Sequence, residues 1–467
     1  MVAHEGHGRG GATARDALDV WMNGERVGTW AVTRAGVSVL QYAETWLASP
    51  RARPLSLSLP FVPGNQPHRG DRVAAWFDNL LPDSPVIRER VRRRFRTRSA
   101  AAFDLLAAIG RDCVGAVQLV PAGADPGDVR RLDAEPLDEA QVARLLRGVT
   151  ATPPLGLTSG DDDEFRISIA GAQEKTALLR LGGRWYRPRG ATPTTHLLKL
   201  PLGLVGNLRA DLRDSVENEW LCLRLLAALG LPVAHAEVAT FADDVGAETV
   251  LVVERFDRAP VDVDGVPTTG RPSWVLRLPQ EDLCQATGTP ADQRYEADGG
   301  PGIARCLAVL AGGERPRADA LTFVRAQLAF WLLAAPDGHA KNFSVFLRRR
   351  GYVLTPLYDV LSAWPIVGPG PNEWPVQKVR LAMALRGKNP HRELHRIAIR
   401  HWRALALQTG APDAFASLVA LVEGADAALA AVGRELPGGF PERVWERIAA
   451  GVRAQRTRFL DAVAGGA

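Results

Sequence analysis

Apolar and polar residues alternate with a period of two in several stretches between residues 18 and 254, which is the pattern of half-buried β-strands. Residues 18–32 alternate around Asn23-Gly24, a pair typical of a type I′ hairpin turn. Residues 249–254 are β-branched and apolar between their two ends, Thr249 and Glu254, as in a strand inside a sheet. Further strands are predicted at residues 55–59, 115–120, 166–170, 175–181, 185–187 and 196–200.

Apolar residues recur at helical spacing in other parts of the chain. Residues 215–229 have this pattern, and Gly230 directly after them is a helix-stop signal. Helical patterns dominate from Pro279 and resume from Pro390, and residues 319–334 are apolar nearly all round, as in a buried helix. Helices are also expected at residues 71–80, 88–98, 103–109 and 137–147.

This order of elements predicts an α+β protein whose strand-rich middle and helical C-terminal half form two lobes. A small α+β subdomain precedes them, and residues 257–271 resemble a polar insertion. We expect four regions: a disordered tail at 1–15, the N-terminal subdomain at 16–122, a strand-rich lobe at 123–258 and a helical lobe at 259–467.

The composition, 46% hydrophobic and 23% charged residues over 467, is that of a globular protein with a large core. No apolar run reaches the roughly 18 residues needed to cross a bilayer. The N-terminus lacks the apolar stretch of a signal peptide. Four scattered cysteines without a C-x-x-C pair indicate small core residues in a reducing compartment. We therefore expect a cytoplasmic protein with no membrane partner.

A net charge of +5 neither requires nor excludes a nucleic-acid partner, but positive charge is locally dense. Two interpretations of the basic run stay open: a solvated helix, or a surface for a phosphate backbone or an acidic partner. The run comprises Arg88, Arg90, Arg92, Arg93, Arg94, Arg96 and Arg98.

The spacing of Asp337, Asn342 and Asp359 is what phosphoryl transfer needs. One carboxylate takes the proton of the acceptor hydroxyl, while the amide and the second carboxylate hold Mg²⁺ on the nucleotide phosphates. His339, two residues after the first Asp, also resembles the corresponding loop of lipid kinases. Ordinary turn chemistry is the alternative interpretation, because Asp and Asn gather in turns.

A second candidate element is the small-residue loop between the strands at 166–170 and 175–181. It is not a Walker loop, because Glu174 precedes Lys175 and the next segment alternates like a strand. Its backbone N–H groups could still lie over phosphates, as in kinase glycine-rich loops. The candidate ATP-binding residues here are Ala170, Gly171, Ala172, Gln173, Glu174 and Lys175.

Lys199 lies between leucines in a predicted strand, and a buried lysine needs an anionic partner. The next helix offers Glu217 and Glu219, which would reproduce the lysine–glutamate pair of kinases. An edge strand with its lysine in solvent is the alternative. Glu254 and Phe256 follow a strand where kinases place the hinge, whose backbone groups bind adenine.

These elements occur in the order of a protein kinase, and long motifs around them resemble the HipA family, the serine/threonine-kinase toxins of bacterial HipBA toxin–antitoxin modules. The resemblance spans roughly residues 18 to 400. It is carried by the motifs at residues 77–82, 110–118, 167–177, 195–199, 253–257, 280–286, 295–302 and 337–344. Ala335-Pro336, directly before Asp337, departs from the polar lead-in expected there.

The resemblance implies a two-lobed kinase-like fold and ATP and Mg²⁺ as cofactors. It implies Asp337 as catalytic base, Asn342 and Asp359 on the metal, and Ser168 as an autophosphorylation site that switches the kinase off. The further ATP-binding residues that it implies are Lys199, Glu254, Phe256, His339 and Lys341.

The resemblance also implies three partners: a helix-turn-helix antitoxin similar to HipB, operator DNA bound through that antitoxin, and an aminoacyl-tRNA synthetase as substrate, most famously the glutamyl enzyme. Two alternative functions remain. One is an antitoxin-binding corepressor with little kinase activity, and the other is a kinase for a small molecule or lipid.

Overall fold

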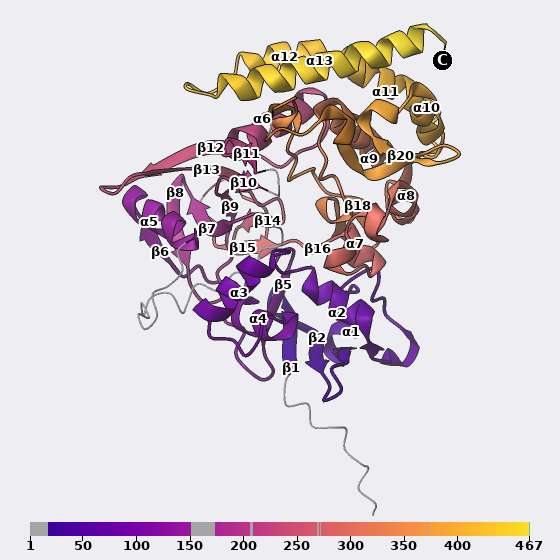
Figure 1. Cartoon of the computed structure of the whole chain (residues 1–467). Helices are drawn as coiled ribbons and strands as arrows, with labels where there is room; N and C mark the ends of the chain where they lie inside the picture. Colours follow the sequence, from indigo (N-terminus) through magenta and orange to yellow (C-terminus); the bar gives the residue numbers. More distant parts are fainter. Residues whose placement is uncertain are drawn as a thin grey trace, which may run out of the picture.

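The computed structural model describes residues 17–150, 173–205, 209–268, 270, 272–370 and 372–466, and the ribbon has three parts (Figure 1). The predicted tail at 1–15 and the predicted strand at 166–170 lie outside these residues. The mixed helix-and-sheet class expected from the sequence is confirmed.

The N-terminal part is built on an antiparallel sheet in the order β4-β3-β2-β1-β5. Asn23 and Gly24 both have positive φ, at 47° and 84°, so the type I′ turn is confirmed. Trp30 stacks on Phe77 with ring centroids 3.9 Å apart, within the core between sheet and helices. The elements are β1 (Ala17–Met22), β2 (Glu25–Val32), β3 (Ser38–Tyr42), α1 (Glu44–Leu47), β4 (His68–Arg69), α2 (Asp71–Asp78), α3 (Pro85–Arg94), α4 (Ala102–Ile109) and β5 (Val117–Pro121).

The middle part is a six-stranded sheet in the order β12-β13-β9-β7-β8-β6. Val142 and Leu146 of α5 pack with Leu198 of β9, while α6 packs on Leu251 and Val253 of β13. The elements are β6 (Ala134–Leu137), α5 (Glu139–Thr150), β7 (Lys175–Leu181), β8 (Arg184–Pro188), β9 (His196–Lys199), the β10 (Gly203–Val205) and β11 (Ala210–Leu212) pair, α6 (Ser215–Ala228), β12 (Ala236–Ala242) and β13 (Ala247–Glu254).

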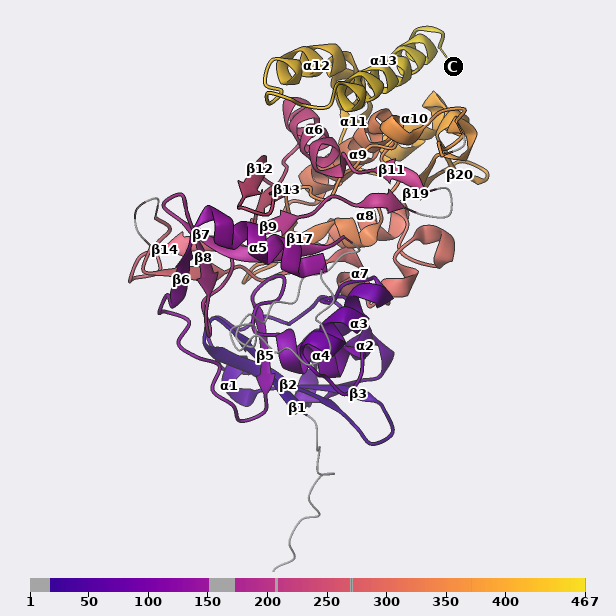
Figure 2. The same cartoon turned by 60° about the vertical axis from the view of Figure 1, so that its left-hand side comes forward.

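The C-terminal part packs around α9 (Pro316–Leu333), most of whose residues are buried, as its uniformly apolar sequence predicts. Helices α12 and α13 lie at the end of the molecule opposite the N-terminal sheet (Figures 1 and 2). The other helices are α7 (Leu283–Thr287), α8 (Ile303–Ala311), α10 (Ile399–Leu407), α11 (Ala414–Glu423), α12 (Ala425–Gly433) and α13 (Glu442–Ala464).

No helix in the described part of the chain is by itself long and apolar enough to cross a membrane. The pair α11 and α12, bent by 42° at the break between them, meets the length and composition test only when taken together.

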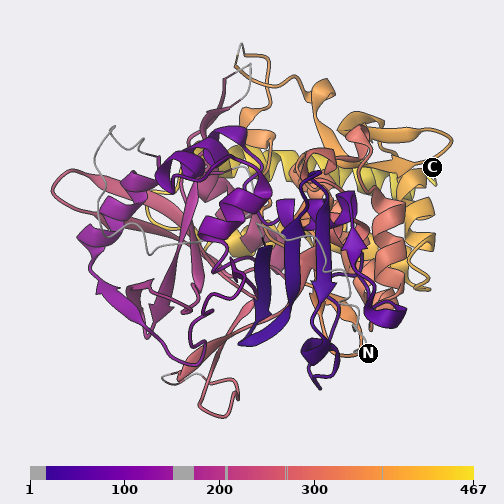
Figure 3. The same cartoon turned by 90° about the horizontal axis from the view of Figure 1, so that it is seen from below.

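Viewed from below, the N-terminal part lies across both other parts (Figure 3). Its side chains bond to each of them: Asn79 Nδ2 donates to the Thr289 carbonyl at 2.9 Å, and Arg90 pairs with Glu174 at 2.5 Å. The N-terminal part therefore fixes both the strand-rich and the helical parts around the space between them.

Three expectations from the sequence are wrong. Residues 55–59 form only an isolated bridge, because Leu55 and Leu59 enter the core while Ser56 and Ser58 bond to the Gln285 carbonyl. The segment at 257–271 is not a simple polar insertion, since Asp257 and Arg258 are buried and β14 (Arg258–Val261) pairs with β15 (Trp274–Arg277).

The third wrong expectation is that the chain turns helical directly at Pro279 and that helices resume at Pro390. A sheet in the order β16-β17-β18 lies beside the site, and a β19-β20 hairpin occupies the place where helices were expected to resume at Pro390. These strands are β16 (Gln280–Asp282), β17 (Ser344–Leu347), β18 (Tyr352–Leu354), β19 (Arg380–Arg386) and β20 (Pro390–Glu393).

Candidate active site

One pocket lies where the three parts meet, and it collects most of the predicted site residues. Its walls come from β7, β9, α6, the end of β13, the loop after α9 and the segment after β18. The lining includes Lys175, Lys199, Glu219, Glu254, Phe256, Asp337, His339, Lys341, Asn342 and Asp359, together with Asn79, Asp83, Asp282, Gln285 and Arg294.

Lys199 joins two carboxylates at the bottom of this pocket. Its Nζ donates to both oxygens of Glu219, at 2.7 and 3.0 Å, and to Asp359 Oδ1 at 2.8 Å. The lysine and Glu219 side chains are only 5% and 2% exposed, so the lysine is not an edge residue in solvent. Of the two glutamates offered by the helix, Glu219 is the partner.

The charges of this group depend on one another. Burial opposes ionisation of Lys199, yet Asp359 and Glu219 hold its pKa above the ordinary value. Burial likewise disfavours the Asp359 carboxylate, but Lys199 and Lys175 hold its pKa below the usual range. Asp359 also has a positive φ of 60°, a conformation that asparagine and aspartate tolerate better than most residues. The Lys199 contact fixes the side chain in that position.

The loop at 337–342 follows α9 directly. The helix ends at Ala334, whose φ of 48° is left-handed, so the chain turns before Pro336. Asn342 Nδ2 then donates to the Asp337 carbonyl at 2.7 Å and closes the loop. A Cβ on Gly338 would lie 2.5 Å from Phe330 Cδ2, so this close approach requires glycine.

The Asp337 side chain is half exposed and faces the pocket. Partial removal from water at the pocket wall raises the pKa of this carboxyl above the ordinary value. The Tyr295 hydroxyl donates to Asp337 Oδ1, and His339 Nε2 lies 3.6 Å from the same oxygen. Arg294 Nε donates to His339 Nε2 at 3.1 Å, and burial lowers the histidine pKa, so the ring is neutral at pH 7.

The donor set in the pocket fits Mg²⁺. Asn342 uses its amide nitrogen within the loop, which leaves Oδ1 as a free acceptor, and Asp359 supplies a carboxylate in the same pocket. Mg²⁺ prefers such oxygen ligands and completes its shell with water and phosphate oxygens. No cluster of three or more His, Cys, Asp or Glu that could hold a metal without a nucleotide occurs among the described residues.

The hinge segment after β13 forms another wall of the pocket. The Phe256 ring lies edge-on to Phe346, with centroids 5.7 Å apart, and its backbone groups bond to no other described residue. Glu254 is exposed, and its amide donates to the His235 carbonyl at 2.9 Å. The free Phe256 backbone can therefore bind the edge of a base.

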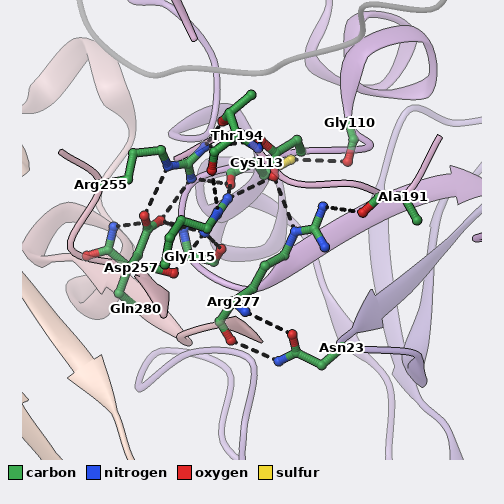
Figure 4. Close-up of polar contacts among 12 residues, drawn as sticks. Asn23, Gly110, Cys113, Gly115, Ala191, Thr194, Arg255, Asp257, Arg277 and Gln280 are labelled. Atoms are coloured by element: carbon green, nitrogen blue, oxygen red, sulfur yellow. Dashed lines mark hydrogen bonds and ion pairs between the residues drawn. The ribbon is translucent and has the colours of Figure 1, made fainter. Parts of the chain in front are cut away.

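A buried ion cluster holds this hinge on the N-terminal part (Figure 4). Arg255 donates to both oxygens of Asp257, at 3.0 and 2.9 Å, and to Asp112 Oδ2 at 3.2 Å. Asp112 also accepts from Arg258 at 2.8 Å and from Arg277 at 3.2 Å. The motifs at 110–118 and 253–257 thus meet in one network next to Phe256.

The structure describes only part of the predicted phosphate loop. Ser168, Ala170, Gly171 and Ala172 lie outside the described residues. Gln173 Nε2 donates to the Leu200 carbonyl at 2.5 Å and Glu174 pairs with Arg90, so neither side chain lines the pocket.

Lys175 does line the pocket, and no ion pair joins it to another described side chain. Burial and the charge of Lys199 lower its pKa to about 8. It is therefore a cation placed to receive an anionic ligand.

Lys341 also lines the pocket, but its Nζ pairs with Asp83 of the N-terminal part at 2.5 Å, and both side chains are buried. Sequence reasoning missed Asp83, Arg294 and Tyr295. The motifs at 77–82 and 295–302 were the available signals, although neither motif states which residue it will contact.

The first part of the basic run forms the helix α3, but the helix ends at Arg94 and not at the expected residue 98, because Arg96 has a left-handed φ of 51°. Several charges of the run are paired within the protein. Arg88 pairs with Asp78, Arg92 and Arg93 with Glu89, and Arg98 with Asp104. The run therefore presents less free positive charge than its sequence suggests.

Comparisons with known proteins identify the family. A family model described as the HipA N-terminal domain matches residues 18–120, and one described as the HipA-like C-terminal domain matches residues 167–431. The chain is similar to the putative kinase Y4mE of Sinorhizobium fredii, with 35% identity over 358 residues, 75% of this chain and 79% of that protein. It is 27% identical over 339 residues to the serine/threonine-protein kinase toxin HipA of Shewanella oneidensis, covering 70% of each chain.

The fold matches a solved structure of Shewanella oneidensis HipA in complex with HipB and its operator DNA. The TM-score is 0.75 at 23% identity, over 96% of this chain and 98% of that one. The kinase-like fold expected from the sequence is thereby confirmed. Because the two family models match most of the chain and its relatives are named as kinases, this protein belongs to the HipA family of kinases.

Proposed function

We propose that this HipA-family kinase transfers the γ-phosphoryl group of ATP to a serine or threonine hydroxyl of a protein. The observation that supports this most strongly is the bonding of Lys199 to Glu219 and Asp359 in the pocket that also holds Asp337 and Asn342. Together these residues supply the positioning and the charge stabilisation on which phosphoryl transfer depends.

In this proposal Asp337 accepts the proton of the acceptor hydroxyl. The acceptor oxygen bonds to the γ-phosphorus while the bond from that phosphorus to the bridging oxygen of ADP breaks. Lys199 and Lys175 neutralise phosphate charge, and the Phe256 backbone binds adenine. Asn342 and Asp359 would hold Mg²⁺, which neutralises the charge developing on the phosphate oxygens when bound. His339 and Lys341 lie on the same loop and shape the phosphate end of the pocket.

The biological setting that we propose is a toxin–antitoxin module. The antitoxin would be a helix-turn-helix protein similar to HipB, and operator DNA would be bound through it. A relative is known in such a complex. The substrate that we propose is an aminoacyl-tRNA synthetase, and the support for it is family resemblance alone.

We further propose that autophosphorylation of Ser168 switches the kinase off. The phosphate would add about −1.5 to −2 charges three residues before Gly171 of the phosphate loop. Two unit charges 4 Å apart interact by about 4 kcal/mol at an effective dielectric of about 20, so ATP would be repelled. Mass spectrometry after incubation with Mg²⁺-ATP tests this: an unmodified Ser168 in a fully active enzyme would contradict it.

Phosphoproteomics tests the acceptor class. The wild-type protein and Asp337→Ala are expressed under the same induction. New phosphoserine or phosphothreonine should appear only with the wild type, and a synthetase among the modified proteins would support the proposed substrate. Phosphorylation only of small molecules or lipids would favour the alternative kinase class, and operator retention without any phosphorylation would favour a corepressor.

A further inference from the structure

Residues 295–302 form a tight turn that has no role in the phosphoryl transfer proposed above. A short 3₁₀ turn, η4 (Glu296–Asp298), begins directly after Tyr295. The Gly300 amide donates back to the Tyr295 carbonyl at 2.9 Å. A Cβ on Gly300 would lie 2.0 Å from the Gln293 carbonyl oxygen, so only glycine allows the chain to close this tightly.

Glu296 anchors this turn to the C-terminal part. Its carboxylate accepts from the Ala384 amide at 2.6 Å and from Arg386 at 2.7 Å, and Arg392 lies 3.4 Å away. The turn is thus fixed to β19 and β20 by a side chain that points away from the pocket. Tyr295, one residue earlier, points toward Asp337.

The Tyr295 ring is held between two neighbours. The Arg294 guanidinium lies 5.0 Å from its centroid, and the His339 ring meets it edge-on at 4.8 Å. Arg294 is itself fixed, since it donates to His339 Nε2 at 3.1 Å and to the Ala291 carbonyl at 3.2 Å. The direction of the tyrosine hydroxyl is therefore set by packing.

The hydroxyl donates to Asp337 Oδ1, while Asp337 Oδ2 accepts no hydrogen bond from the described residues. A carboxylate on a free side chain can rotate about its last bond, and both oxygens are then equivalent. A bond to one oxygen fixes the plane and presents the other oxygen in a single direction. A base must meet its proton within hydrogen-bond reach, so this direction matters for catalysis.

We infer that Tyr295 is a positioning residue, which orients the Asp337 carboxylate so that Oδ2 faces the acceptor hydroxyl. This inference rests on the proposed function, because it takes Asp337 as the base. It assigns a role to a motif outside the catalytic loop. It also predicts an effect on the rate of transfer and not on the binding of ATP, since Tyr295 is absent from the pocket lining.

The test is steady-state kinetics of the full-length protein with Tyr295→Phe, which keeps the ring between Arg294 and His339 and removes only the hydroxyl. We expect kcat to fall about ten- to hundredfold, as for a misplaced reacting group, with KM for ATP within about twofold of wild type. The matched control is Tyr352→Phe, whose hydroxyl donates to the Val309 carbonyl at 2.6 Å outside the pocket, and its kcat should not change.

A second measurement separates this inference from the proposed function. In an Asp337→Asn background, adding Tyr295→Phe should cause no further loss, because the hydroxyl acts only through the carboxylate. The inference would be overturned if Tyr295→Phe left kcat unchanged, or if it raised KM for ATP by as much as it lowered kcat. A fall in kcat as large in the Asp337→Asn background as in the wild-type background would also overturn it. An active Asp337→Asn enzyme would instead refute the proposed base.

Discussion

Asp112 offers the sharpest test of how the N-terminal part supports the hinge. Its Oδ1 accepts from Arg258 and Arg277, while its Oδ2 accepts from Arg255 and from the amide and hydroxyl of Thr194. Asp112→Asn keeps the shape of the side chain but replaces one of the two acceptor oxygens by an NH₂ group. Only one oxygen can then accept hydrogen bonds, and the NH₂ group faces the donors that the other oxygen had accepted. Arg255 and Arg258 keep Asp257 as a partner, but the buried Arg277 guanidinium loses the carboxylate with which it pairs among the described residues.

Removing one partner of a buried ion pair costs about 3–5 kcal/mol. A domain has about 5–15 kcal/mol of stability in total, so Asp112→Asn should remove a large share of it. Urea unfolding followed by tryptophan fluorescence at pH 7 measures the change. The matched control is Asp104→Asn, which breaks the ion pair with the exposed Arg98 and should cost about 1 kcal/mol or less.

The pH dependence of the free energy of unfolding provides a second test of the Asp112 ion pairs. Burial opposes ionisation of Asp112, but Arg258, Arg255 and Arg277 hold its pKa below the ordinary value. A carboxyl whose pKa is depressed by folding contributes stability above its unfolded pKa and loses it as the pH falls. Wild type should therefore lose stability below about pH 4 more steeply than Asp112→Asn. Equal stability losses in Asp112→Asn and Asp104→Asn would refute this reasoning.

The remaining predictions concern the pocket. Lys199→Ala should weaken Mg²⁺-ATP binding in calorimetry and lower turnover, and unchanged affinity with unchanged turnover would make Lys199 an ordinary strand residue. Because the pKa of Lys175 is about 8, ATP affinity should fall as the pH rises from 7 to 9, and Lys175→Met should lose this dependence. Asp83→Asn should cost about 3 kcal/mol of stability by leaving Lys341 buried without its partner, and Lys341→Met in the same chain should recover most of it.

Local signals explain which parts of the fold were predictable. The hairpin at 18–32 depends on a two-residue turn, and the helix at 215–229 depends on its own periodicity, so both could be inferred from neighbouring residues. Residues 55–59 also alternate, but their serines bond to a carbonyl 227 and 229 residues away, which no local pattern reveals.

The residues of the candidate site also fall into those that the sequence could predict and those that it could not. Lys199, Glu219, Asp337, Asn342 and Asp359 could be found because their types and order match the requirements of phosphoryl transfer. Asp83 and Asp112 could not, since each acts through a partner more than a hundred residues away in another part of the chain. Buried polar residues with distant partners explain the failures at 55–59 and 257–271.

ATP-dependent phosphoryl transfer by wild type, Asp337→Ala and Asp359→Ala tests the central claim most directly. Asp337→Ala removes a half-exposed charge, and Asp359→Ala leaves Lys199 paired with Glu219, so both variants should still fold and circular dichroism should match wild type. Transfer of labelled phosphate should fall by at least about 10²-fold in both variants. Turnover within about tenfold of wild type in both folded variants would contradict the assignment of this pocket as the kinase active site.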